Sequence, residues 1–104
     1  MTFTSTIEVP TTSASKYLQQ VCKHWAHNLV VKFTPEQGTV TFPKDAREAN
    51  HPGDGLVTFT ATAASLAMRI DATSEAQLEG LKGAAARHLN RFAFREAPLA
   101  FDWR

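Results

Sequence analysis

Short segments in which apolar and polar residues alternate with a period of two set the strongest limit on the fold, because this pattern is typical of strands that bury one face of a sheet. They cover residues 3–9, 30–33, 39–42, 57–62 and 66–71. In most of them the polar positions carry Thr, Lys, Arg or Glu. We therefore predict an antiparallel sheet with one face in water and one face covered.

The links between these segments predict two hairpins. Residues 34–38 contain Pro35, which presets one turn dihedral, and Gly38, which accepts a positive φ. Ala63, Ala64 and Ser65 form the second, shorter link. Residues 43–55 are rich in Pro, Gly, Asp and Asn and are predicted to be a surface loop, either a plain connector or a functional lid.

The first of two predicted helices covers residues 13–28. Thr12 or Ser13 can cap its start, and Asn28 can take the left-handed position that ends it. Apolar residues recur along it at steps of three and four: Leu18, Val21, Cys22, Trp25 and Leu29.

The second predicted helix begins at a capping box, in which Ser74 precedes Gln77 by three residues and Glu75 lies in the first turn. It ends before Pro98, and residues 99–103 alternate as a candidate closing strand. Its apolar stripe consists of Leu78, Leu81, Ala85, Leu89 and Phe92.

This order predicts a two-layer α+β sandwich, β-α-β-β-β-β-α(-β), with two helices on one face of the sheet. The same order occurs in the TATA-binding-protein-like and helix-grip folds. A chain of 104 residues is long enough for one core, so residues 1–104 are expected to form a single domain.

Composition excludes several classes of protein. The chain is 43% hydrophobic and 20% charged, and it contains neither a signal-peptide pattern nor an apolar run of membrane-spanning length. Because Cys22 is the single cysteine, no internal disulfide is available, and we expect a cytoplasmic protein. A net charge of +1 gives nucleic-acid binding no support. The sequence does not decide between a monomer and a homodimer.

The segment from Cys22 to His27 raises the question of a metal site. At about 100° per residue, Cys22 and His24 point roughly 200° apart on a helix, so they cannot share one ion. His24 and His27 lie closer, and His51 or His88 can join them, but these histidines do not make the four-ligand set of a structural zinc site. We therefore expect no metal and no cofactor.

An anion site is the stronger candidate. His24 and His88 each lie at the border of a helical apolar stripe, so two helices side by side can bring them together. Arg87, Arg91 and Arg95 follow at four-residue intervals and form a ridge whose guanidinium groups suit carboxylate or phosphate. In the alternative, each histidine bonds a backbone carbonyl or water, and acids such as Glu96 and Asp102 pair with the arginines. The candidate ligand-binding residues are His24, His88, Arg91, Arg95, Lys23 and Trp25.

Two other functions find little support. Gly80-Leu81-Lys82-Gly83 has the GxxG spacing of a nucleic-acid-binding KH loop, but it falls inside a continuous helical stripe. Glycines there would instead let a neighbouring backbone come close. Sequence signatures of enzymes, such as GxSxG, HExxH and GxGxxG, are missing, so no catalytic residue is assigned and we do not expect an enzyme.

Three blocks of sequence resemble the small bacterial family called domain of unknown function 2218: residues 17–20, 22–25 and 88–96. The resemblance implies no site residues. Some relatives carry a dihydroxyheptenedioate aldolase label, which does not fit a chain this short, because such aldolases resemble eight-fold barrels of about 250 residues. Others accompany siderophore-interacting flavin reductases. We expect a non-enzymatic module that binds a small anion or a protein partner; the alternative is an accessory protein or enzyme of iron metabolism acting with a cofactor or a flavin reductase.

Overall fold

The computed structural model describes residues 2–44, 52–93 and 103. Its elements are β1 (Phe3–Pro10), α1 (Ala14–Trp25), β2 (Val30–Phe33), β3 (Gln37–Phe42), β4 (Gly55–Ala61), β5 (Ser65–Ala72) and α2 (Glu75–Phe92). The predicted class and element order are confirmed. The candidate closing strand lies outside the described residues except for Trp103, which belongs to neither a helix nor a strand.

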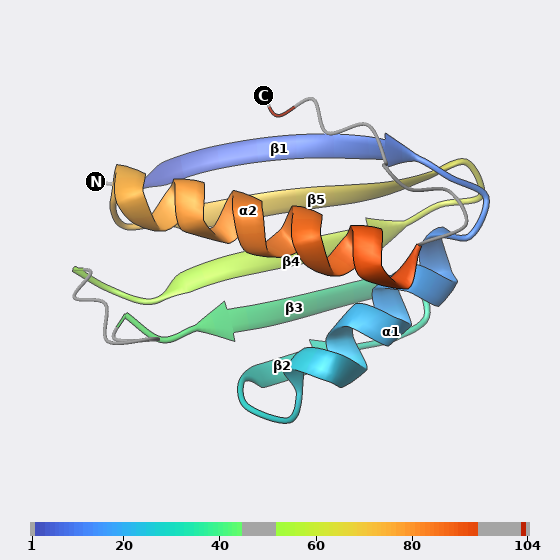
Figure 1. Cartoon of the computed structure of the whole chain (residues 1–104), viewed down its shortest axis with the longest axis horizontal. Coiled ribbons are helices and arrows are strands. Elements are labelled where there is room, and N and C mark those ends of the chain that lie inside the picture. The colour runs from blue at the N-terminus through green and yellow to red at the C-terminus, as the bar shows by residue number, and fades with distance from the viewer. Residues whose placement is uncertain (1, 45–51, 94–102, 104) are drawn as a thin grey trace.

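The strands form one antiparallel sheet in the order β1-β5-β4-β3-β2. Both predicted hairpins, β2–β3 and β4–β5, are present. β1 lies against β5, with Ile7 opposite Met68, so the first and last strands of the described chain are neighbours. Figure 1 shows α1 and α2 on the same side of this sheet, with α2 crossing its middle and α1 near β2.

The covered face of the sheet carries the apolar positions predicted from the alternation. Val9, Val57, Phe59 and Ile70 are at most 1% exposed, and they pack against the buried stripes of both helices. On the opposite face, Thr39 and Thr58 lie in register on β3 and β4 beside Arg69 of β5. Hydroxyl and charged groups stay hydrated there, so this face needs no second layer of helices.

α1 differs from its prediction at both ends. Ser13 occupies the N-cap position without a side-chain hydrogen bond to the helix. The helix ends at Trp25, before the predicted Asn28, because the chain then tightens into turns in which Asn28 N–H donates to the carbonyl of Trp25 at 3.1 Å. Ala26, at the C-cap, keeps a right-handed φ of −62°. The tighter turns deliver Leu29 to the edge of the core.

α2 begins as the capping box predicts. The Ser74 hydroxyl accepts a hydrogen bond from Gln77 N–H at 3.0 Å. The Gln77 side chain, 4% exposed, accepts from Thr73 N–H at 2.7 Å and donates to the carbonyl of Gly53 at 3.0 Å. The start of α2 is therefore tied to the end of the segment that precedes β4. Within that segment, residues 45–51 lie outside the described part of the chain.

Two glycines of the sheet allow the helices to lie close to it. A Cβ at Gly38 would lie 2.8 Å from Cys22 Sγ of α1, and a Cβ at Gly55 would lie 2.6 Å from Leu81 Cδ1 of α2. The predicted turn role of Gly38 is wrong, because Gly38 pairs with Phe33 inside the hairpin and has no positive φ. Its function is to leave room for the Cys22 thiol.

The glycines of α2 do not serve the close approach that the sequence predicts. A Cβ at Gly80 would have nothing within 4 Å, and one at Gly83 would meet only the Arg87 side chain of the same helix. Both lie inside one continuous helix, so the GxxG sequence forms no loop.

We predict that Gly38→Ala lowers the free energy of unfolding by about 1–3 kcal/mol, because the new methyl overlaps Cys22 Sγ. Cys22→Ala removes that sulfur, so the double variant should be more stable than the sum of the single effects implies. Urea unfolding of the four proteins measures this coupling. Strictly additive effects would show that the thiol does not set the spacing.

Gly80→Ala should raise the free energy of unfolding by about 0.5–1 kcal/mol, because alanine favours the helix and the site is open. Gly83→Ala is the matched control and should gain less stability, since its methyl would lie 3.0 Å from Arg87 Nη1. Thermal or urea unfolding compares the two. A loss of stability in Gly80→Ala would contradict a continuous α2.

Candidate functional site

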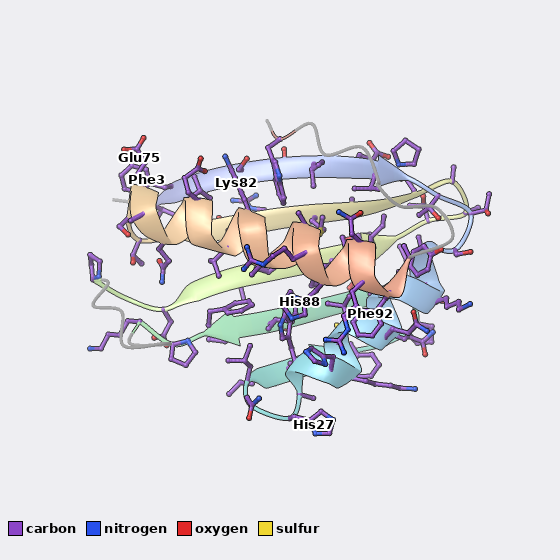
Figure 2. The ribbon with its side chains drawn as sticks, in the orientation of Figure 1. Phe3, His27, Glu75, Lys82, His88 and Phe92 are labelled. Carbon is purple, nitrogen blue, oxygen red and sulfur yellow. The ribbon has the colours of Figure 1, made fainter. Side chains whose placement is uncertain are left out.

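His24 of α1 and His88 of α2 meet where the two helices pack together. Their ring centroids lie 5.1 Å apart, with the ring planes tilted by 49°. Figure 2 shows His88 and Phe92 directed from α2 toward α1. The border positions predicted from the two apolar stripes therefore come together. We call His24, His88 and the neighbouring Arg91 the helix-junction site.

Trp25 forms the floor beneath this pair. Its ring centroid lies 4.8 Å from that of His88, 5.1 Å from that of Phe42 and 6.2 Å from that of Phe59. Because Trp25 is only 7% exposed, it belongs to the core and supports the site from below. Aromatic side chains in such edge and tilted arrangements hold one another in place. The sheet thus fixes the depth at which His88 lies.

Phe92 closes one side of His24, with ring centroids 5.8 Å apart in an edge-to-face arrangement. The sequence assigns Phe92 to the packing stripe of α2 but not to the site. The spacing of Phe92 could have placed it there. Residues 88 and 92 stand four apart on one helical face, so a side chain that contacts His88 commonly contacts Phe92 too.

His88 is held by a hydrogen bond within its own helix. Its Nδ1 lies 2.7 Å from the carbonyl oxygen of Ala84, one turn earlier. The alternative raised from the sequence, a bond from His88 to a backbone carbonyl, is thus observed for a ring that also contacts His24. The bond leaves Nε2 as the nitrogen that is available to a ligand.

The helix junction is electropositive. The pKa of His24 is lowered from its ordinary value near 6.5 by burial and by the positive charges of His88, Arg91 and His27. Among the described residues, both ion pairs lie elsewhere, Arg69 with Asp71 and Lys82 with Glu79. No acidic side chain in that part of the chain pairs with Arg91. The site therefore offers positive charge and imidazole donors to a ligand of opposite charge.

The remaining predicted residues are distributed unevenly around this site. Arg91 is exposed on α2 and acts on His24, whereas Lys23 is exposed and turned about 100° from His24 along α1. Arg95 lies outside the described residues. Arg87 is also exposed, with its guanidinium near Gly83. His27 points away from α2 in Figure 2.

Cys22 lies in the core and not in the site. It is fully buried with a free thiol, and burial raises the pKa of that thiol to about 11. Such a thiol is a poor nucleophile and a poor metal ligand at neutral pH. Within residues 2–44 and 52–93, no three His, Cys, Asp or Glu side chains lie close enough to hold a metal ion.

A broad hollow lies on the open face of the sheet. Threonines and small residues of β1, β4 and β5 line it, together with Glu8 and Arg69. These two charged groups already have partners, since Glu8 accepts a hydrogen bond from the Ser65 hydroxyl at 2.7 Å and Arg69 pairs with Asp71 at 3.1 Å. At the helix junction, by contrast, no acidic side chain of the described residues pairs with Arg91, so the junction is the better candidate.

Neither described helix is long and apolar enough to cross a membrane.

Among solved structures, the chain is similar to the Pseudomonas aeruginosa protein PA4090, determined by NMR, with 30% sequence identity and a TM-score of 0.75. That match covers 98% of this chain and 95% of the other. Curated proteins give no significant match.

The model of the family described as "Uncharacterized protein conserved in bacteria (DUF2218)" matches residues 6–104, which is nearly the whole chain and includes both helices of the candidate site. The chain is a member of the DUF2218 family.

Proposed function

We propose that this chain is a non-enzymatic module that binds a small oxyanion at the helix-junction site. The observation that carries the proposal is the 5.1 Å approach of His24 to His88 from two different helices, beside Arg91. Three nitrogen-bearing side chains that are positive when protonated gather there, and Arg91 keeps its charge at neutral pH. Groups of like charge that are held together in this way are commonly balanced by a ligand of the opposite charge.

The chemistry of the side chains selects the ligand class. A guanidinium group binds two oxygens of a carboxylate or phosphate, and an imidazole donates one further hydrogen bond. A cation is disfavoured, because the charge of Arg91 repels it and also lowers the pKa of His24. The floor of the site is Trp25, which offers no carboxylate to a metal. Carboxylates, phosphates and sulfate are the expected ligands.

We also propose that the protein works in the cytoplasm. What supports this location is its single cysteine, Cys22, which is buried, unpaired and held as a neutral thiol. Small proteins of oxidising compartments usually gain stability from disulfides, which this chain cannot form internally. Cell fractionation tests the location, and recovery with secreted protein would end the proposal.

An NMR titration with sulfate, phosphate and citrate tests the binding site. We expect saturable shifts of the His24 and His88 ring signals and of the Arg91 amide. Arg91→Gln should weaken binding about tenfold, the effect of losing one charged hydrogen bond. Arg87→Gln, the matched control one turn away, should change the dissociation constant by less than about twofold, since its guanidinium lies near Gly83 and, unlike that of Arg91, does not act on His24. An equal loss of affinity in both variants, or the absence of a chemical-shift change at either histidine, would contradict the proposal.

Even without a ligand, the positive groups around His24 predict that the folded protein loses stability at low pH. Because the pKa of His24 is lower in the folded than in the unfolded chain, the unfolded chain binds the proton first as pH falls. The contribution of His24 to the free energy of unfolding is therefore fully present above about pH 6.5 and is lost as pH falls through the pKa of His24 in the folded chain. Urea midpoints between pH 7.5 and 5 should fall less in His24→Gln than in the wild type, with His27→Gln as control. Identical pH profiles in wild type and His24→Gln would contradict the cluster.

A further inference from the structure

The hydrogen bond between His88 Nδ1 and the carbonyl of Ala84, at 2.7 Å, decides which ring nitrogen carries the proton. A carbonyl oxygen only accepts hydrogen bonds, so Nδ1 must carry a hydrogen. A neutral imidazole has one N–H, and its other nitrogen is then a bare acceptor. The neutral form of His88 therefore presents a lone pair at Nε2, the nitrogen left for a ligand.

A lone pair at Nε2 and a fully deprotonated oxyanion repel each other. Addition of one proton turns Nε2 into a donor and adds a positive charge to the ring, while the Nδ1 bond to Ala84 stays in place. We infer that oxyanion binding at the helix-junction site is coupled to a proton held between the anion and Nε2 of His88. This inference rests on the proposed function and adds to it the protonation state that the ligand requires.

The surroundings of His88 assign this proton to its ring and not to His24. From α1 the His88 ring contacts His24 and the uncharged ring of Trp25, which in turn contacts Phe42 and Phe59 of the sheet. Among the other basic residues, Arg87 and Arg91 of α2, Lys23 of α1 and His27 just beyond its end are exposed, and of these Arg91 and His27 act on His24. Burial and these neighbours disfavour the charged form of His24. A bound anion is the group that offsets a charge on His88.

The coupling distinguishes two kinds of oxyanion. Sulfate carries no hydrogen near neutral pH, so His88 must supply the proton and sulfate should bind poorly until the ring is charged. Hydrogen phosphate has a hydroxyl group that can donate to the bare Nε2, so it can bind while the ring is neutral. The site should therefore prefer hydrogen phosphate to sulfate near pH 7.5 and lose that preference near pH 5.5.

The test measures dissociation constants of sulfate and phosphate for the full chain at pH 7.5 and 5.5, at constant ionic strength, from NMR shifts. Binding of sulfate should tighten about tenfold at the lower pH, the effect of a one-unit pKa shift on one group, whereas phosphate should change by less than about threefold. His88→Gln offers an amide donor at every pH and should lose most of the sulfate dependence. His27→Gln should keep it.

The outcomes separate this inference from the proposed function. Sulfate binding of equal strength at both pH values overturns the proton coupling and leaves the anion site standing. Absence of binding at both pH values overturns the two together. An unchanged pH dependence in His88→Gln also overturns the coupling. Nitrogen shifts of the wild-type His88 ring supply a test that needs no variant, because a hydrogen on Nε2 in the neutral ring would contradict the tautomer.

Discussion

The close packing of two helices on one face of a single sheet is the constraint on which the other features depend. Gly38 and Gly55 remove the Cβ atoms that would hold α1 and α2 away from the strands. With the helices at this depth, Trp25 reaches Phe42 and Phe59 of the sheet and still contacts His88 of α2. Helices lying higher above the sheet would break this chain of ring contacts. The geometry of the helix-junction site is therefore set by the backbone spacing of the layers.

Much of the fold could be predicted because periodicity reports which face of an element is buried. The stripe from Leu18 to Trp25 and that from Leu78 to Leu89 are buried as expected. Periodicity does not say which strands are neighbours, so the pairing of β1 with β5 could not be predicted from the alternation. The turn role assigned to Gly38 failed for a related reason, since glycine serves tight turns and close packing alike.

The candidate site was predictable to the level of helix faces and no further. The border positions of His24 and His88 were enough to suggest that they meet. Lys23 was among the candidate residues, although one helical step turns it away from His24. The partner of His88 Nδ1 depends on a ring rotation that no sequence pattern encodes. Phe92 was assigned only to packing, because the sequence does not tell a core residue from one that also borders a polar group.

The contact between Trp25 and His88, with centroids 4.8 Å apart, has a spectroscopic consequence. A charged imidazolium beside an indole quenches its fluorescence more strongly than the neutral ring does. The second indole, Trp103, lies near Lys82 Nζ, 6.0 Å from its ring centroid, and not beside a histidine of the described chain. The intrinsic fluorescence of Trp25 is thus expected to report the charge on His88 without an attached dye.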